Sequence, residues 1–274
     1  MAQQNPFQTR PYGLIRHAAV PCVLALVVLL GGCATIGDMF SDMFRQKPQA
    51  LLPAGDLYQA GEQELNKKNY VAARANFQKI VERHPQSNYA PRARFLIGEA
   101  YFREGTFDKA IKEFEGFMSF YPRHEIADLV QFRLAMSYYD QMKPVEQDQG
   151  LTIKAIDQFK KLVREYPDSR YASDALAKID ICRGRLAQKE LWVAAYYLEN
   201  ENNPLAARQR LEGVLKDYPR SLIVPEALFR LADINAREGR TEEAQQMFKK
   251  LASEYPYTEW GRRAIQRLRT AASN

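Results

Sequence analysis

Cysteine is scarce in this chain, and its placement excludes a disulfide framework. Only three cysteines occur among the 274 residues, at Cys22, Cys33 and Cys182. The first two fall in an amino-terminal stretch that we expect to be processed, which leaves Cys182 as the only free thiol. Intrachain disulfides therefore cannot staple the fold, so a packed hydrophobic core must hold it together.

Histidines and catalytic motifs are equally scarce. Of three histidines, His17 lies in the amino-terminal stretch, and His84 and His124 have no third ligand and fit no zinc spacing. There is no P-loop, nucleophile elbow or zinc-protease helix. Paired acids such as Glu242 and Glu243 stand in a first helical turn, where the helix dipole favours them. We therefore expect a protein that is not an enzyme and uses no metal or other cofactor.

Positive charge is in slight excess but is not gathered in one place. The formal charge is +6, and it falls to +4 when Arg10 and Arg16 are removed with the amino-terminal stretch. The basic residues are spread along expected helices without a block of interleaved aromatic residues, which argues against nucleic acid as a partner. A composition of 46% hydrophobic and 26% charged residues is typical of a folded globular protein.

A hydrophobic run long enough to cross a membrane is also missing. The run 18–30 has 13 residues and is interrupted by Pro21. Such a helix spans only about 20 Å, whereas the hydrocarbon core is roughly 30 Å thick. Because a polar leader with basic residues precedes the run, the pattern predicts a signal peptide.

A lipid attachment signal follows the apolar run. Residues 30–33 read Leu-Gly-Gly-Cys and resemble the bacterial lipobox. The resemblance implies cleavage between Gly32 and Cys33, removal of residues 1–32, and acylation of Cys33. Several acyl chains anchor stably, since each buried methylene contributes about 0.8 kcal/mol. Ala34 after the cysteine implies sorting to the outer membrane. The alternative is an ordinary cleaved signal with a chance cysteine.

From residue 54 onward the chain repeats itself five times. Each copy has an alanine, a large apolar residue four positions later, and a proline twelve positions after the alanine. The alanines are Ala73, Ala110, Ala155, Ala207 and Ala244, the large residues are Phe77, Phe114, Phe159, Leu211 and Phe248, and the small residues expected in the preceding helices are Gly61, Gly98, Ala135, Ala195 and Ala232. This pattern resembles the tetratricopeptide repeat. Since one repeat cannot bury its apolar face, we predict an all-α, tetratricopeptide-like solenoid of five helical hairpins, preceded by a lipoprotein signal peptide.

Uneven spacing divides the predicted solenoid. Successive repeat prolines are 37, 45, 52 and 37 residues apart. The extra residues of the third repeat fall in a polar loop at 143–150, and those before the fourth fall in 171–198, which contains no proline and predicts one helix of about 40 Å. We therefore predict an acylated tether at 33–53, amino-terminal repeats 1–3 at 54–170, and a long joining helix with repeats 4–5 at 171–274.

The first helices of the repeats are expected to line a concave wall with a peptide groove. Two sets of apolar residues occupy equivalent positions, and two arginines stand near them. The sets are Tyr58, Phe95 and Phe132, and Leu65, Phe102 and Tyr139, with Arg92 and Arg103 beside them. Such a groove suits an extended segment rich in aromatic side chains, with the arginines available for carboxylates. The alternative is that the rings form core between adjacent first helices.

The chain resembles the BamD family of lipoproteins in its lipobox, its five repeats and the runs Arg185–Ala187, Val193–Leu198 and Arg210–Pro219. BamD proteins belong to the outer-membrane β-barrel assembly machinery. The resemblance covers nearly the whole mature chain and is most specific in the stretch through Arg210. It implies a lipid-anchored subunit on the periplasmic face of the outer membrane. It further implies docking on the POTRA region of BamA beside other assembly-complex lipoproteins, and reception of unfolded barrel precursors. Arg210 matches the family arginine that pairs with an acidic residue of BamA.

Alternatives remain at three levels. The chain departs from the family in the shorter loop at 143–150 and in His84, which replaces a usual tyrosine, so contacts of those positions are not carried over. Arg210 could instead be a surface arginine paired within its own helix. The arginines of 260–269 fit either an acidic partner or the polar cap of a last repeat. For the whole chain, the alternative is another tetratricopeptide lipoprotein, such as a secretin pilotin or a cell-envelope coordinator.

Overall fold

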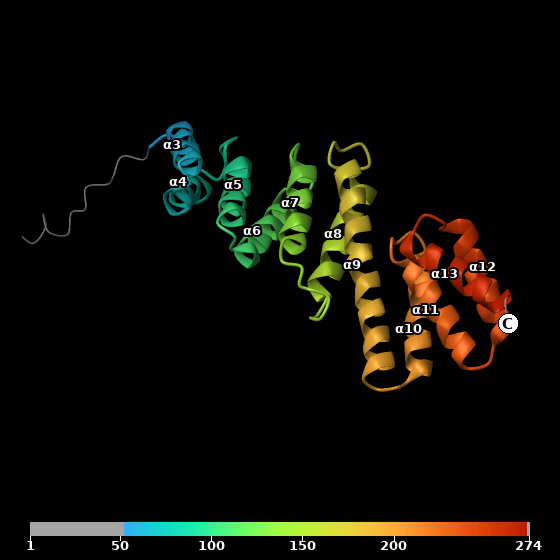
Figure 1. Ribbon diagram of the computed structural model, residues 1–274. Coiled ribbons are helices and arrows are strands. Elements are labelled where there is room, and N and C mark those ends of the chain that lie inside the picture. Colours follow the sequence, from blue (N-terminus) through green and yellow to red (C-terminus); the bar gives the residue numbers. More distant parts are fainter. Residues whose placement is uncertain (1–51, 273–274) are drawn as a thin grey trace, which may run out of the picture. The chain divides into compact units, whose positions relative to one another are not determined.

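The protein is described by a computed structural model that covers residues 52–272 (Figure 1). Within that range all regular structure is helical, which confirms the all-α prediction. The helices are α3 (Ala54–Asn66), α4 (Tyr70–Arg83), α5 (Ala90–Arg103), α6 (Phe107–Phe120), α7 (Ala127–Tyr139), α8 (Gly150–Glu165), α9 (Ala172–Glu199), α10 (Pro204–Asp217), α11 (Val224–Arg237), α12 (Thr241–Glu254) and α13 (Glu259–Ala272). Gly32, Cys33 and the signal peptide lie outside the described residues, so cleavage and acylation stay predictions.

Consecutive helices form hairpins that pack in sequence order. Each helix from α4 to α12 contacts the helix before it and the helix after it. Figure 1 shows the pairs α3–α4, α5–α6, α7–α8, α9–α10 and α11–α12, followed by α13 against the last pair. The five predicted hairpins are therefore confirmed. Within residues 52–272 no helix combines the length and the apolar character that crossing a membrane requires.

The repeated alanine and aromatic positions form the core of each hairpin. Ala73, Phe77, Ala110 and Phe114 are all completely buried. Gly61 in α3 faces Phe77, and a Cβ on that glycine would lie 2.5 Å from the Phe77 ring. In the next repeat, a Cβ on Gly98 would lie similarly close to the Phe114 ring. A small residue in the first helix is therefore required for the ring of the second helix to pack.

One predicted small position was wrong by a single residue. In the fourth repeat the buried residue is Ala194, whereas Ala195 is only half-buried. The reason is the turn that follows. Residues 200–203 join α9 to α10, whereas the corresponding turn between α5 and α6 is residues 104–106, one residue shorter. Counting back twelve residues from Ala207, as in the other repeats with short turns, therefore stops one position short of Ala194.

The ends of the first helices follow the expected chemistry. Gly105 and Gly239 adopt left-handed φ angles of +79° and +81°, which glycine tolerates, just after α5 and α11. Thr258 accepts a hydrogen bond from the Gly261 amide at 3.0 Å and so caps α13. The Ser87 hydroxyl accepts a hydrogen bond from the Tyr89 amide in the turn before α5.

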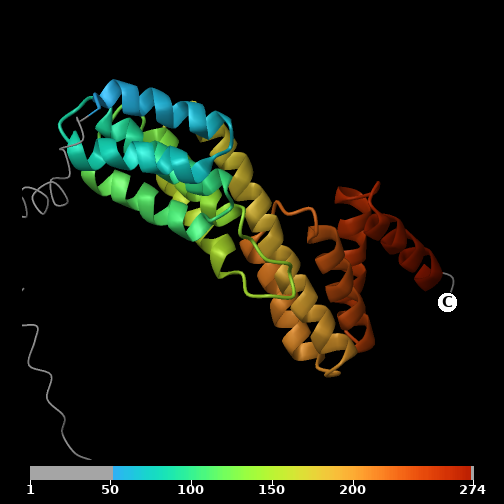
Figure 2. The same ribbon diagram turned by 90° about the vertical axis from the view of Figure 1, so that its left-hand side faces the viewer.

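Helix α9 confirms the prediction of one long helix in the middle of the chain. It has 28 residues, which corresponds to about 42 Å. It packs against both α8 and α10, and Figure 2 shows its length from the side. The polar loop before α8 rests on it, because Arg185 and Lys189 donate to the Lys143 and Glu146 carbonyl oxygens at 3.4 and 3.1 Å. The division at 170/171 into two groups of repeats stays a prediction.

Candidate binding surfaces

A cavity of about 660 Å³ lies on the first helices of the amino-terminal repeats. Its lining includes Tyr58 of α3, Tyr89 and Arg92 at the start of α5, and Glu125 before α7. The Tyr58 ring is held from two sides, with centroids 5.9 Å from Phe77 and 5.1 Å from Tyr89. Two residues of the predicted groove, Tyr58 and Arg92, are thus brought together here.

The polar groups that line this cavity are exposed to solvent, and their ion pair is weak enough to be exchanged. Arg92 forms an ion pair with Glu125 at 2.6 Å, although the two side chains are 53% and 66% exposed. The hydrogen bond that the Arg92 guanidinium donates to the Glu125 carboxylate raises the pKa of Arg92. Burial, and then the carboxylate of Glu62, raise the pKa of Tyr58, so its hydroxyl stays protonated. Exposed pairs contribute little stability, so Arg92 can exchange Glu125 for another carboxylate.

Tyr89 was missed by the sequence analysis, although a signal for it exists. It stands four residues after the repeat proline Pro85. The same position in two other repeats holds Tyr171 and Trp260, which are also in ring contact with a first helix. In these three repeats, the residue four positions after the proline therefore packs on a ring of the preceding first helix.

The rings of Phe95 and Phe132 are largely used within the fold. Phe95 lies 6.0 Å from Phe114, and Phe132 lies 5.9 Å from Phe159 and is stacked at 5.0 Å on Tyr171. Both are half-buried. These contacts agree with the alternative in which the rings form core between adjacent helices. Only the exposed edges of the two rings are left to contact a ligand.

The second predicted set of groove residues, Leu65, Phe102 and Tyr139, packs mainly against other side chains of the fold. Leu65 is only 5% exposed and belongs to the core of the first repeat, so its assignment to an open groove was wrong. Its position at the end of α3 faces α4 rather than solvent. Phe102 lies 5.4 Å from Phe107 and under the Arg133 guanidinium. Tyr139 contacts Phe159 edge-on at 6.2 Å.

Arg103 is already engaged by a buried carboxylate. Glu99 of α5 has a side chain only 3% exposed, and it pairs with Arg103 at 2.8 Å and with Arg133 of α7 at 2.9 Å. A buried charge requires such partners. Arg103 therefore has less freedom to meet a ligand than Arg92. Glu99 was not singled out from the sequence, because a carboxylate between two helices looks like any other acidic helix residue.

Arg210 lies on α10 and reaches across to the preceding helix. Its guanidinium is 3.1 Å from the Glu190 carboxylate of α9, and the arginine side chain is 45% exposed. The hydrogen bond and charge of Glu190, and then a hydrogen bond with Tyr197, raise the pKa of Arg210. The pairing is thus with a neighbouring helix rather than within its own helix. The guanidinium remains accessible from solvent.

The described residues contain no group suited to metal binding. Between residues 52 and 272, no three histidine, cysteine or acidic side chains come together as a metal site would need. Cys182 is buried in α9 with its sulfur 3.6 Å from that of Met142. Burial raises the pKa of the Cys182 thiol to about 11, so it is protonated and a poor nucleophile at neutral pH.

The chain is similar to a family of known lipoproteins over most of its length. Residues 52–247 match the YfiO family, described as outer membrane lipoprotein. Three similar proteins are each named outer membrane protein assembly factor BamD. That of Caulobacter vibrioides is 30% identical, covering 93% of this chain and 79% of that protein. Those of Rickettsia prowazekii and Neisseria meningitidis are 29% and 26% identical, covering 87% and 85% of this chain and 91% and 90% of theirs. The chain therefore belongs to the BamD (YfiO) family of outer membrane lipoproteins.

Proposed function

We propose that this chain is a non-catalytic, lipid-anchored subunit of the outer-membrane β-barrel assembly complex. In this role it docks on the POTRA region of BamA and receives unfolded barrel precursors. The observation that carries the proposal is the similarity to BamD proteins over 93% and 87% of the chain. Those names favour an assembly factor over a pilotin or an envelope coordinator. The repeated helical hairpins supply extended walls for binding polypeptides, which suits a subunit that acts by binding alone.

Docking is proposed to use Arg210. Its partner Glu190 is itself a surface residue, 29% exposed, so an acidic residue of BamA can take over the guanidinium without leaving a buried charge unpaired. Arginines that become fully desolvated at the centre of an interface are common hot spots. The ion pair between Arg210 and Glu190 is therefore compatible with docking, because Arg210 can exchange Glu190 for a carboxylate of BamA.

Reversal of this charge tests the docking role. We expect Arg210→Glu to reduce co-purification with BamA by about 100-fold, because two carboxylates would then face the acidic partner. Lys216→Glu is the matched control, since Lys216 is an exposed cation on the same helix. Helicity and melting temperature should be unchanged in both variants. Undiminished co-purification of the Arg210 variant would contradict the docking role.

Reception of precursors is proposed to use the amino-terminal cavity. Tyr58 and Tyr89 supply apolar faces, and Arg92 supplies an exchangeable cation. Together they suit an extended segment that presents aromatic side chains beside carboxylates. The proposal narrows the predicted groove to these residues, because Leu65 is core and Arg103 is held by Glu99.

Variants at the cavity test this second role. We expect the combination Tyr89→Ala and Arg92→Glu to weaken binding of an unfolded barrel precursor by about 10-fold or more, measured by fluorescence anisotropy. Arg123→Glu is the control, because Arg123 is exposed in the next turn and does not line the cavity. Equal losses in both variants would point to general charge attraction and would overturn the assignment of the cavity.

A further inference from the structure

A second cavity lies at the other end of the repeats, on the first helices α9, α11 and α13. It has a volume of about 490 Å³ and lies where the turn after α9 meets α11 and α13. Its floor includes Phe229 and Trp260, whose ring centroids are 5.3 Å apart. Arg230, Arg237 and Arg263 contribute to its lining. The size lies within the range of small-ligand and side-chain pockets.

This cavity repeats the construction of the amino-terminal one. In both, one ring stands three residues before the small residue of a first helix, and a second ring stands four residues after the repeat proline. An arginine follows three residues later. In the first repeat these residues are Tyr58, Tyr89 and Arg92, and in the last repeat they are Phe229, Trp260 and Arg263. The ring separations agree, at 5.1 and 5.3 Å.

In each cavity, a phenylalanine of the second helix packs against the first-helix ring from the side away from the cavity. Phe77 backs Tyr58 at 5.9 Å, and Phe248 backs Phe229 at 5.5 Å. Each cavity is lined by residues of three successive first helices or of the turns beside them. These are α3, the start of α5 and the turn before α7 for the first cavity, and α9, α11 and α13 for the second. The same local sequence pattern therefore builds the same aromatic floor at both cavities. The third repeat has the equivalent rings, Phe132 and Tyr171, but carries Asp174 where the two cavities have arginine.

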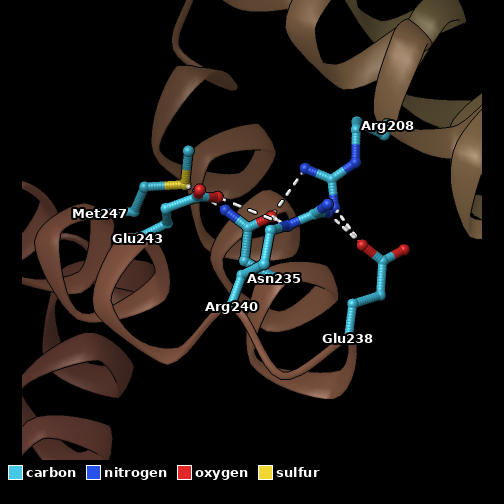
Figure 3. A network of polar contacts seen from close by, with 6 residues as sticks. All are labelled: Arg208, Asn235, Glu238, Arg240, Glu243 and Met247. Atoms are coloured by element: carbon cyan, nitrogen blue, oxygen red, sulfur yellow. Dashed lines mark hydrogen bonds and ion pairs between the residues drawn. The ribbon is translucent and has the colours of Figure 1, made fainter.

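Most of the acidic groups at the second cavity already have arginine partners. Asp233 pairs with Arg237 at 2.8 Å and with Arg267 at 2.7 Å. Glu238 pairs with Arg208 at 2.7 Å and also with Arg240 (Figure 3). Because each of these carboxylates is shared by two guanidinium groups, neither attracts a further cation strongly.

The guanidinium of Arg263 is held loosely. It pairs with Glu259 at 2.9 Å one turn earlier on α13, and the two side chains are 52% and 60% exposed. Arg263 also lies 4.7 Å over the Trp260 ring, which places the charge at the edge of the aromatic floor. Arg92 has the same loose pairing at the first cavity. An incoming carboxylate beside an apolar group would therefore meet complementary charge here.

We propose that the cavity at Phe229, Trp260 and Arg263 is a second peptide-binding site. It takes an extended segment of a partner protein in which an aromatic side chain lies next to a carboxylate. The site is separate from Arg210 and from the amino-terminal cavity, so the chain can hold two such segments at once. Two linked segments would bind more tightly than either alone through their effective concentration. The inference rests on the geometry of the two cavities and not on the identity of the precursor.

Tryptophan fluorescence gives a direct test. The chain has two tryptophans, so Trp192→Phe leaves Trp260 as the only one. The probe is a peptide in which 4-bromophenylalanine and aspartate alternate, because bromine quenches indole fluorescence on contact. We expect saturable quenching in the full chain. We also expect about 10-fold weaker binding when Arg263→Ala is added, since a charge-assisted hydrogen bond is lost.

Matched controls separate this site from others. Arg262→Ala should leave quenching unchanged, because Arg262 is exposed on the same helix and donates to the Tyr257 carbonyl instead. The combination Tyr89→Ala and Arg92→Glu should weaken binding at the first cavity and leave quenching of Trp260 intact. A failure of the first cavity is thereby distinguished from a failure of this one.

Three outcomes would overturn the proposal. They are absence of saturable quenching, equal weakening by Arg262→Ala and Arg263→Ala, and undiminished quenching by a peptide with asparagine in place of aspartate. The first would show that no aromatic segment enters the cavity. The other two would show that the Arg263 guanidinium does not select a carboxylate. Circular dichroism of each variant verifies that the helices are retained.

Discussion

The ring of Phe77 passes so close to α3 that a side chain on Gly61 would meet it at 2.5 Å. By contrast, a Cβ on Gly184, within α9, would meet nothing within 4 Å. Both glycines lie inside helices, where glycine weakens the helix relative to alanine by about 1 kcal/mol. The contact with the neighbouring helix therefore decides the role of each glycine, and propensity alone does not.

The two glycines should respond oppositely to alanine. We expect Gly61→Ala to destabilise the fold by about 1–3 kcal/mol, because the ring of Phe77 must move in a close-packed core. Gly184→Ala should stabilise it by up to about 1 kcal/mol. Urea unfolding followed by circular dichroism measures both. A neutral or stabilising Gly61→Ala would contradict the packing described for the first repeat.

The thiol of Cys182 should be unreactive toward alkylating reagents in the folded protein. Burial raises its pKa from an ordinary value of 9.0 to about 11, so the thiol resists alkylation at pH 8 until the chain unfolds. Because the folded pKa lies above the unfolded one, this group's contribution to stability is complete below pH 9 and is lost as the pH rises toward 11. Iodoacetamide labelling resolved by peptide mass spectrometry checks this. Fast labelling of Cys182 without denaturant would contradict it.

Residues that act within one repeat were predictable, and residues that act between repeats mostly were not. The alanine at 73 and the ring at 77 share a helix face, so their spacing alone indicates burial. Leu65 was misplaced because position on a helix does not show how far a neighbouring helix covers it. Glu99 and Tyr89 became visible only when the facing helix was in place.

Hairpins are joined to one another by a recurring polar contact. An arginine directly after a buried alanine of one second helix meets a glutamate directly before the left-handed glycine of the next first helix. Arg74 meets Glu104 at 2.8 Å, and Arg208 meets Glu238 at 2.7 Å. In the second case the buried Asn235 accepts hydrogen bonds from Arg208 at 2.7 Å and from Arg240 at 3.1 Å (Figure 3).

Removal of the shared acceptor should loosen the joint between α10, α11 and α12. We expect Asn235→Leu to cost about 1–3 kcal/mol, because Arg208 would lose a partner in a half-buried site. Gln246→Leu is the control, since Gln246 is exposed on α12. Unfolding in urea in a Trp192→Phe background, with the fluorescence of Trp260 as a local probe, measures the effect. Equal stability of the two variants would show that the network contributes nothing.

Element lengths were predictable where proline or its absence decides them. Helix α9 runs through 28 residues because no proline or left-handed glycine interrupts it. The turn after α9 was not predictable to the residue, since Asn202 takes a positive φ of 45° where the second and fifth repeats use Gly105 and Gly239. The extra turn residue then shifts the buried alanine from 195 to 194.

For the whole molecule, the two cavities and Arg210 are the surfaces through which binding is proposed. The order of helices followed from the repeat alone, because each hairpin must cover the apolar face of the next. The cavities did not follow from it, since their depth depends on how three first helices diverge. The partner of each surface depends on chemistry outside this chain, so its identity stays a proposal.

A photo-cross-linker at Gly213 in living cells tests the central claim most directly. Gly213 lies one turn from Arg210 on α10, and a side chain there meets nothing within 4 Å. With Arg210 left intact, illumination should join position 213 to BamA. A cross-linker at Glu212, which is exposed and lies about 160° around α10 from Arg210, should yield at most a tenth as much product. Capture of BamA equally from both positions, or from neither, would contradict docking through the Arg210 surface.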